Sequence, residues 1–474
     1  MVLVNGVINA GTAENSLSLD IVAEKLSSIP SPFIDNLDIL KYNDFTGIEA
    51  FRVTLAEFLT THANSSSPLD PNKLVVMNGL TSMVCALATV LSDVGDAWLI
   101  PTPYYSAIRA DVSKIPQVNL VYAHLPAASV CTLSIQFFYV QYGRLVVIPH
   151  VNASINDTRH KVLVKVEGGA VNSSMMRLAC ELHHDAERVV PGCNLPPAET
   201  VQGCLSEAEC QPFQLNVDIL ETSLAKAKTQ GYNVRCLFLI NPHNPLGDVY
   251  SKELVLQCLQ FAKRNNLHVI MDEIYMLSIF QDDVKFTSVF SLDTLPDPQR
   301  THVIWGFSKD FSMSGMRCGA VYTWNDRVLI ALKQISPFFG MPTFSQCYLN
   351  EMIKDKDWVE KTYLPTNLQR LRKAHKNMSD GLTKIGVPHL VRPSGLFIWA
   401  DFSKYITPST FDGEMELFYE ILDNKVYVAP GQDFFCCQPG WFRIIFSIDE
   451  DKQEVSLKRL SVVLKKRMSS LNSE

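Results

Sequence analysis

The chain is organised around the stretch Trp305-Gly306-Phe307-Ser308-Lys309-Asp310-Phe311-Ser312-Met313-Ser314-Gly315-Met316-Arg317-Cys318-Gly319. The apolar run before it, residues 301–305, is typical of a short buried strand. A lysine therefore follows the carboxyl end of a strand, which is where open α/β sheets bind their ligands. There Lys309 can form a Schiff base if its surroundings keep the amine partly neutral. On this stretch alone, a surface lysine in a loop is the alternative.

Length and composition narrow the class of protein. The chain has 474 residues, enough for two or three domains with a large core. Its 47% hydrophobic and 19% charged residues are ordinary for a soluble globular protein. A net charge of −7 without a long basic run argues against nucleic acid as a partner. No apolar run is long enough to span a membrane, so we expect no membrane association.

The N-terminus and the cysteines indicate a compartment. The first residues lack the basic and apolar regions of a signal peptide. The twelve cysteines show no paired spacing of the kind that binds metal, which favours reduced thiols. We therefore expect a cytoplasmic protein without a metal site.

Two more apolar runs end in polar side chains. The first, residues 234–240, leads to Asn244, and the second, residues 267–271, leads to Asp272 and Tyr275. An amphipathic helix over residues 252–265, with Ser251 as its N-cap, separates them. Such strand–helix alternation predicts an α/β fold with a mostly parallel sheet covered by helices on both faces. Three consecutive strands then end in Asn244, in Asp272 with Tyr275, and in Lys309.

The N-terminal half offers a place for a phosphate. Residues 74–77 read as a strand, residues 78–82 as a turn and residues 83–91 as an apolar helix. Free backbone N–H groups and the helix dipole converge at such a turn, so Thr81 and Ser82 are candidate phosphate contacts. The motif is weak by itself because many helices begin this way.

These side chains are the groups that pyridoxal 5′-phosphate needs. A buried carboxylate such as Asp272 would keep the ring nitrogen protonated, although an Asp-Glu pair can also simply cap a helix. Asn244 and Tyr275 would donate hydrogen bonds to the phenolate oxygen. Arg317 would join the helix N-terminus at the phosphate. Tyr105 would stack on the ring, or else pack in the core.

Arg443 is a candidate for substrate binding. It alternates with apolar residues on a predicted strand over residues 441–446. A buried arginine needs an anion, and the α-carboxylate of an amino acid is a natural bidentate partner. A structural salt bridge is the alternative.

Taken together, these segments resemble the fold-type-I pyridoxal-phosphate enzymes of aminotransferase class I/II, and among them the 1-aminocyclopropane-1-carboxylate synthase-like proteins of animals. The resemblance rests on residues 11–15, 101–105, 241–248, 272–275, 308–317 and 441–443. It implies pyridoxal 5′-phosphate as cofactor, an amino acid as substrate and a homodimer whose active site is shared between subunits.

The resemblance also assigns roles and domains. It implies that Lys309 binds the cofactor covalently, that Ser308 is a further phosphate contact and that Glu14 lies near the substrate. It implies the roles given above for Tyr105, Asn244, Asp272, Tyr275, Arg317 and Arg443. We expect an arm and part of the small domain over residues 1–45, a large cofactor-binding domain over 46–335 and a small α+β domain over 336–474.

Residues 126–210 depart from the family pattern. Residues 133–148 and 161–166 look β-rich, but periodicity is then lost. The segment holds Cys131, Cys180, Cys193, Cys204, Cys210 and the pair His183-His184, whose spacings match no zinc-site pattern. It is either a surface insertion or a gene-model error. We favour the second because regular alternation resumes directly afterwards.

Three residues depart from the family within the expected site. Phe45 stands where the plant synthases have a tyrosine that crosses the dimer, Leu80 crowds the phosphate turn, and Gly306 replaces a serine phosphate ligand. We expect aminotransfer on α-amino acids. The alternatives are 1-aminocyclopropane-1-carboxylate synthesis, or another elimination from S-adenosylmethionine, and an inactive homologue that serves as a binding protein.

Overall fold

The computed structural model describes most of the chain, namely residues 6–31, 37–127, 131–135, 138–141, 144–147, 151–156, 161–165 and 212–471. The chain divides into two compact units. The larger unit consists of Met1–His124 and Leu215–Glu474, and the smaller of Leu125–Gln214. Every candidate site residue belongs to the larger unit.

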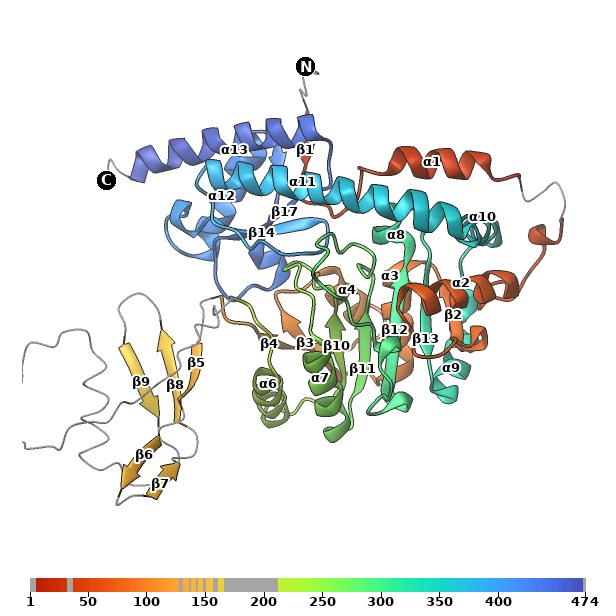
Figure 1. The fold of residues 1–474 in the computed structure, drawn as a ribbon, viewed down its shortest axis with the longest axis horizontal. Helices are drawn as coiled ribbons and strands as arrows, with labels where there is room; N and C mark the ends of the chain where they lie inside the picture. Colours follow the sequence, from red (N-terminus) through yellow and green to blue (C-terminus); the bar gives the residue numbers. More distant parts are fainter. Residues whose placement is uncertain are drawn as a thin grey trace, which may run out of the picture. The chain divides into compact units, whose positions relative to one another are not determined.

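A seven-stranded sheet forms the centre of the larger unit (Figure 1). In spatial order its strands are β2 (Leu74–Met77), β13 (Gly319–Thr323), β12 (Thr301–Gly306), β11 (His268–Asp272), β10 (Val234–Ile240), β3 (Ala97–Thr102) and β4 (Asn119–His124). Within this sheet only β13 runs antiparallel to its neighbours. All residues of β2, β3, β12 and β13 are buried, which explains their largely apolar sequences.

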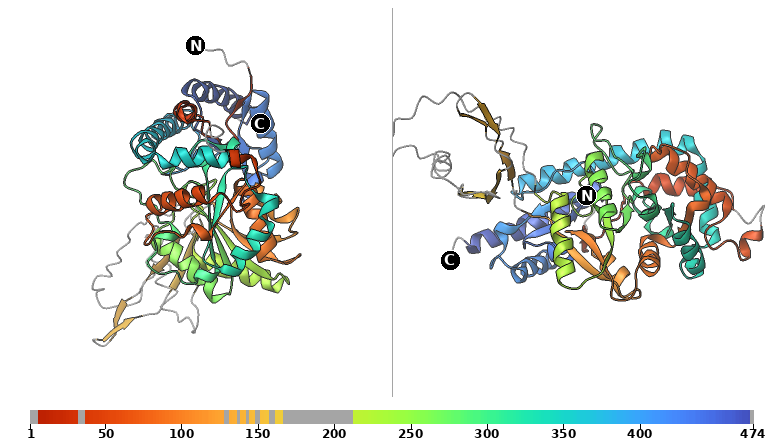
Figure 2. Two further views of the ribbon diagram at one scale, coloured as in Figure 1. Left: turned by 90° about the vertical axis from the view of Figure 1, so that its right-hand side faces the viewer. Right: turned by 90° about the horizontal axis from the view of Figure 1, so that it is seen from below.

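Helices cover both faces of this sheet, as Figures 1 and 2 show. On one face, α3 (Gly79–Leu91), α4 (Ala107–Ser113) and α9 (Asp326–Phe339) share a buried apolar cluster with the strands. The other face carries α6 (Val217–Thr229), α7 (Lys252–Arg264) and α2 (Glu49–His62). On that face Phe58 of α2 packs on Trp305 of β12, with ring centroids 5.3 Å apart. The predicted α/β fold is thus confirmed.

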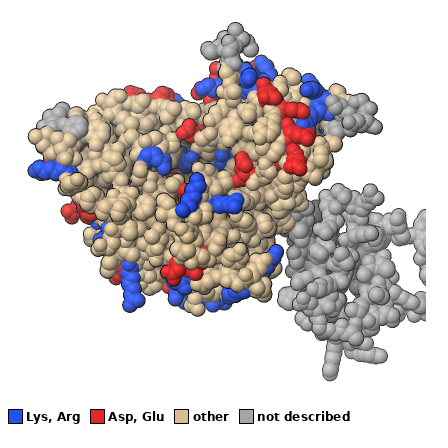
Figure 3. Space-filling view, turned by 180° about the vertical axis from the view of Figure 1, so that it is seen from behind, with Lys and Arg blue, Asp and Glu red and all other residues tan. Residues whose placement is uncertain are grey.

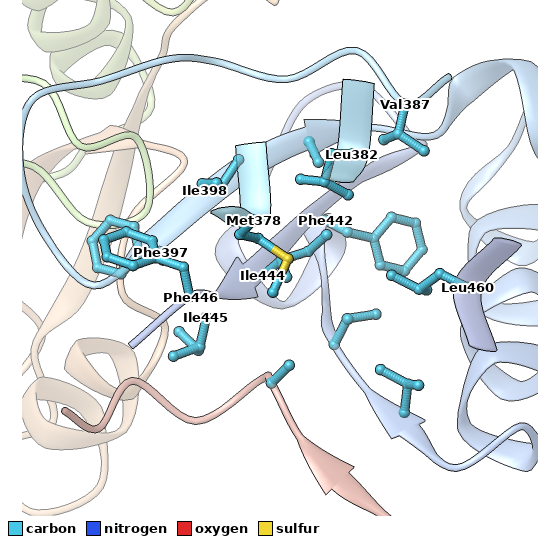
Figure 4. Close-up of a cluster of buried hydrophobic side chains, with 14 of the residues drawn as sticks. Met378, Leu382, Val387, Phe397, Ile398, Phe442, Ile444, Ile445, Phe446 and Leu460 are labelled. Atoms are coloured by element: carbon cyan, nitrogen blue, oxygen red, sulfur yellow. The ribbon is translucent and has the colours of Figure 1, made fainter. Parts of the chain in front are cut away.

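A smaller antiparallel sheet consists of β14 (Phe397–Asp401), β17 (Trp441–Ile445) and β16 (Ala429–Pro430). Its apolar core also takes in side chains of α11 (Leu364–Lys384), α12 (Phe411–Asp423) and α13 (Glu450–Leu471). Figure 4 shows part of this core, with Met378 and Leu382 of α11 beside Phe442 and Ile444 of β17. The N-terminal arm joins it, because β1 (Ile8–Asn9) pairs in parallel with β15 (Val426–Tyr427).

Short elements complete the described part of the larger unit. They are the helices α1 (Leu19–Ser28), α8 (Phe307–Asp310) and α10 (Thr343–Lys354), the π-helix η6 (Trp358–Tyr363), and the 3₁₀ turns η1 (Leu37–Leu40), η2 (Pro71–Lys73), η3 (Val289–Ser291), η4 (Pro298–Arg300), η5 (Ser314–Met316), η7 (Ser403–Tyr405) and η8 (Gly431–Phe434). The predicted domain boundaries near residues 45 and 335 stay a prediction.

The local predictions agree with most of these elements. The hydroxyl of Ser251 accepts a hydrogen bond from the N–H of Leu254, as expected of the N-cap of α7. One prediction is wrong: α3 begins at Gly79 and not at residue 83. Thr81 and Ser82 therefore lie in its first turn and not in a turn before it.

The smaller unit is described only in its strands and in the few residues at its two ends. β5 (Cys131–Ile135), β8 (Val151–Asn156) and β9 (Lys161–Lys165) form one antiparallel sheet, and β6 (Phe138–Gln141) pairs with β7 (Arg144–Val147). Strands β5, β6, β7 and β9 agree with the β-rich stretches expected over residues 133–148 and 161–166, whereas β8 lies outside both. Cys180, Cys193, Cys204, Cys210 and the pair His183-His184 lie outside the described residues.

Candidate active site

Three neighbouring strands bring the predicted side chains together. β10, β11 and β12 are adjacent and parallel, so their carboxyl ends lie at one edge of the sheet. Asn244 follows β10, Asp272 ends β11 and Lys309 follows β12. The amide Nδ2 of Asn244 donates to the hydroxyl of Tyr275 at 3.3 Å. The strand arrangement that the sequence predicts therefore places these four residues at one edge.

Lys309 lies in a half-buried position on the single turn of α8. Its Nζ donates to the backbone carbonyl of Ala13 at 2.5 Å. The pKa of Lys309 is lowered to about 8, first by burial and then by the positive charges of Arg443 and Arg317, while Glu14 and Asp272 oppose this shift. An appreciable fraction of the amine is therefore neutral near pH 7–8, as a nucleophile requires.

Asp272 is only 2% exposed and accepts a hydrogen bond from the N–H of Ile274 at 3.1 Å. Burial raises the pKa of its carboxyl to about 7, although the hydrogen bond from Ile274 and the charge of Lys309 oppose this shift. A cation placed against this carboxyl would lower the pKa again and ionise it. The position thus suits a protonated ring nitrogen.

Arg443 lies in the middle of β17 and is buried. Its Nη1 donates to the side chain of Asn244 at 3.0 Å and its Nη2 to the carbonyl of Gly11 at 2.6 Å. The ring of Phe434 lies 4.6 Å from the guanidinium carbon. The Nε of Arg443 has no hydrogen-bond partner among the described residues. A buried N–H without an acceptor favours binding of an anion, and a carboxylate fits the guanidinium fork.

The N-terminus of α3 and Arg317 form the candidate phosphate end. Gly79, with φ of +79°, opens the helix, and a Cβ there would come within 2.5 Å of Nη2 of Arg317. Only glycine lets the guanidinium lie so close to the first turn of α3. Backbone N–H groups and a cation thus converge there, as a phosphate group requires.

The two hydroxyls predicted at the phosphate end already have partners. Ser82 donates to the carbonyl of Asn78 at 3.1 Å. The hydroxyl of Thr81 faces Asp111 and lowers the pKa of that carboxyl, although burial raises the pKa to about 6. Binding of phosphate here would therefore rely first on the backbone of the helix and on Arg317.

The remaining predicted residues lie around this edge. Tyr105 is half-buried, and burial raises its pKa, whereas the charges of Arg443 and Arg317 lower it. Ser308 is buried on α8 next to Lys309. Glu14 is exposed and accepts a hydrogen bond from the hydroxyl of Ser314 at 2.8 Å. Each of these three residues is thus near a group of the candidate site, and their roles stay predictions.

The three departures have distinct structural settings. Phe45 is 45% exposed. Leu80 is half-buried and packs against both apolar cores. A Cβ on Gly306 would come within 2.6 Å of the carbonyl oxygen of Cys318, because β12 and β13 approach closely there. A serine at position 306 is thus incompatible with this backbone.

Sequence reasoning missed two kinds of contact. The carbonyls of Gly11 and Ala13 accept from Arg443 and Lys309, but a backbone acceptor is present at every position and leaves no mark in the sequence. Asp310 is fully buried next to Lys309. In the sequence, its position directly after the lysine is the one signal that could have identified it.

The described residues contain no group of three or more histidines, cysteines and acidic residues placed to hold a metal ion. None of the described helices is both long enough and apolar enough to cross a membrane. On the face shown in Figure 3, lysines and arginines lie in small groups among acidic residues.

Comparison with known proteins adds to this geometry. Residues 7–129 and 190–460 match the family model of aminotransferase class I and II. The chain is 36% identical over 460 residues to the 1-aminocyclopropane-1-carboxylate synthase-like protein 1 of Mus musculus, covering 97% of this chain and 76% of that protein. It is 35% identical over 466 residues to the probable inactive 1-aminocyclopropane-1-carboxylate synthase-like protein 2 of Homo sapiens, covering 98% and 68%.

Solved structures agree with the fold. The aromatic aminotransferase from Pyrococcus horikoshii is similar with a TM-score of 0.66 and 20% identity, over 98% of this chain and 96% of that one. A double mutant of Thermus thermophilus aspartate aminotransferase has a TM-score of 0.66 and 17% identity, over 97% and 92%. The resemblance noted from the sequence is confirmed.

Proposed function

The chain belongs to the aminotransferase class I and II family, and we propose that it is an enzyme that transfers the amino group of α-amino acids. The cofactor of the family is pyridoxal 5′-phosphate, and the donor set described above fits it. The observation that carries the proposal is the half-buried Lys309, whose pKa is lowered to about 8 and whose charge interacts with those of Arg443 and Asp272.

We assign the cofactor contacts as follows. Asp272 would bind the ring nitrogen, Asn244 and Tyr275 the phenolate oxygen, and Tyr105 the ring face. The phosphate would be bound by Arg317, Ser308 and the first turn of α3 with Thr81 and Ser82. The support for this assignment is chemical: a buried carboxyl, neutral donors and a cation occur at separate places around Lys309.

We propose a separate role in catalysis for each of three residues of the chain. When bound, the cofactor supplies an electron sink for the substrate. Arg443 would bind the substrate α-carboxylate through its fork, with Glu14 near the side chain. Nζ of Lys309, in its neutral form, would take the proton from the α-carbon as general base. Partial burial of Lys309 would favour this transfer because less water competes for the amine.

Two other functions have support from particular observations. The names of the relatives include 1-aminocyclopropane-1-carboxylate synthase, for example that of Solanum lycopersicum at 27% identity, so lyase chemistry on S-adenosylmethionine is one alternative. The other is an inactive homologue acting as a binding protein. It is favoured by Phe45 and Leu80 and by the relative called probably inactive. The retention of Lys309, Asp272 and Arg443 around one edge argues against inactivity.

We further propose that the chain works as a homodimer with a shared active site, in the cytoplasm. The exposed ring of Phe45, at the position from which the plant synthases contribute a tyrosine across the dimer, supports a shared site. Sedimentation of the purified chain would test the assembly.

The proposal is tested by the visible spectrum of the purified chain with added pyridoxal 5′-phosphate, followed by borohydride reduction and peptide mapping. We expect one covalent adduct, on Lys309, that is absent from Lys309→Ala and present in Lys361→Ala, since Lys361 is exposed and paired with Asp357. Bleaching by single amino acids or by S-adenosylmethionine would then separate the two enzymatic functions. If the folded chain forms no adduct at saturating cofactor, the proposal that it is an enzyme of this family is wrong.

A further inference from the structure

Asp310 directly follows Lys309 and ends the single turn of α8. It is 0% exposed, and none of the roles assigned above uses it. Its carboxylate accepts hydrogen bonds from the indole Nε1 of Trp305 at 2.9 Å, from the hydroxyl of Ser278 at 2.7 Å and from the N–H of Leu277 at 3.1 Å. All three partners are donors, so the position needs an acceptor with several lone pairs.

These donors come from the two segments that form the edge of the sheet. Trp305 belongs to β12, which leads into Lys309. Leu277 and Ser278 follow Tyr275 in the loop after β11. One carboxylate therefore joins the turn that carries Lys309 to the loop that follows Asp272 and carries Tyr275.

The backbone of Asp310 is bound as well. Its carbonyl accepts a hydrogen bond of 2.7 Å from the hydroxyl of Tyr363, which is the last residue of the π-helix η6. The ring of Tyr363 stacks on Phe311 with centroids 4.8 Å apart. The residue after Lys309 is thus bound to other segments through both its side chain and its main chain.

The turn of α8 depends on such contacts. It has four residues, and one hydrogen bond of the helical i→i+4 type, from the N–H of Phe311 to the carbonyl of Phe307 at 3.2 Å, closes it. Helices this short are not stable by themselves. Apolar packing of Phe307 and Phe311 holds the turn in the core but has little directionality, whereas hydrogen bonds fix its rotation.

We propose that Asp310 is a positioning residue that orients α8 so that the Lys309 amine stays at the carbonyl of Ala13 and partly shielded from water. The inference rests on the proposed function, because it concerns the lysine that would bind the cofactor. In Asp310→Asn, the NH₂ group of the amide would face at least one of the three donors. At least one of the hydrogen bonds between α8 and its neighbours would therefore be lost.

The test compares Asp310→Asn and Ser278→Ala with Glu273→Gln in the full-length chain. Glu273 is an apt control because it is a buried carboxyl in the same loop, yet it accepts from Ser288 at 2.6 Å and from the N–H of Val289 at 2.9 Å and not from the Lys309 turn. The first readout needs no cofactor: the pH dependence of labelling of Lys309 by an amine-reactive reagent, quantified by mass spectrometry.

We expect the labelling midpoint of Asp310→Asn to rise by about one pH unit or more, since a less shielded amine returns toward its ordinary pKa. At a fixed pH below the midpoint, labelling then falls about tenfold, because each unit of pKa is a factor of ten in neutral amine. In Ser278→Ala the labelling midpoint should rise by a smaller amount, and in Glu273→Gln the midpoint should equal that of the wild-type chain. The rate of adduct formation with pyridoxal 5′-phosphate should follow the same order.

Each outcome has a separate meaning. If Asp310→Asn and Ser278→Ala label as Glu273→Gln does, the positioning role is wrong whether or not the cofactor binds. If Asp310→Asn does not fold, Ser278→Ala decides alone, since it removes one donor only. If the wild-type chain forms no adduct but the labelling midpoints shift as expected, the proposed function fails and the role of Asp310 stands.

Discussion

Arg443 and Asn244 are joined by a hydrogen bond of 3.0 Å, although 199 residues separate them in the sequence. The arginine belongs to the small antiparallel sheet and the asparagine to a strand end of the large sheet. Asn244 in turn donates to Tyr275 at 3.3 Å. The residue proposed to bind the substrate is therefore connected by hydrogen bonds to those proposed to bind the cofactor.

The first prediction concerns Arg443→Lys. Lysine cannot form two parallel hydrogen bonds to a carboxylate, so we expect a loss of about 2–3 kcal/mol in substrate binding, or roughly 30- to 150-fold in KM. The measurement is KM and kcat for an amino acid that bleaches the cofactor. Arg459→Lys is the control, because Arg459 donates to backbone carbonyls of Gly6 and Lys425 away from the site. An unchanged KM in Arg443→Lys would show that the carboxylate binds elsewhere.

The second prediction concerns the pH dependence at Lys309. The amine is the nucleophile only when neutral, and its pKa is lowered to about 8. The rate of covalent attachment of pyridoxal 5′-phosphate should therefore rise about tenfold per pH unit below that value and level off above it. Stopped-flow absorbance from pH 6 upward gives the profile. A rate that keeps rising to the pKa of an ordinary lysine would contradict the burial of this side chain.

Much of this site follows from patterns in the sequence. Strands β10, β11 and β12 are buried on both faces and so read as apolar runs, and the polar residues that follow each run stand out by contrast. The amino-acid pattern alone therefore predicts that Asn244, Asp272 and Lys309 lie together. The start of α3 is harder to predict, since Gly79 is a helix breaker by type and yet opens the helix here.

Other parts depend on contacts that residue type does not encode. Asp310 looks like an ordinary polar neighbour of Lys309 until folding places Trp305 and Ser278 against it. From the sequence alone, glycine at position 306 indicates only that a serine contact to the phosphate has been lost. The structure gives a steric reason for it, namely the carbonyl of Cys318 on the neighbouring strand.

The third prediction follows from that contact. Gly306→Ser should not restore a phosphate contact but should destabilise the fold by about 2 kcal/mol, because its Cβ meets a backbone atom that cannot move aside easily. Urea unfolding of the variant gives the free energy. Gly315→Ser is the matched control, since nothing lies within 4 Å of a Cβ there. A gain in cofactor affinity in Gly306→Ser would contradict this prediction, because it would show that the backbone next to β13 can move to accommodate the serine.

The fourth prediction concerns Ser312, whose φ of +59° is in the left-handed region. A side chain at such a position strains the backbone, so Ser312→Gly should stabilise the chain by about 1 kcal/mol. Asn266→Gly is the comparison: its φ is +56°, but asparagine tolerates this region, and the gain should be smaller. Equal midpoints of urea unfolding for wild type and Ser312→Gly would mean that other contacts of the serine offset the strain.

The contacts of the N-terminal arm have a consequence for the order of folding. Gly11 accepts from Arg443 across 432 residues of sequence, Ala13 accepts from Lys309 across 296, and β1 pairs with β15. Contacts so distant along the chain close large loops and form late. During synthesis the arm emerges before β15 and β17 and has no partner until these two strands have left the ribosome. The large sheet can assemble earlier, so the candidate site should be the last region of the molecule to become native.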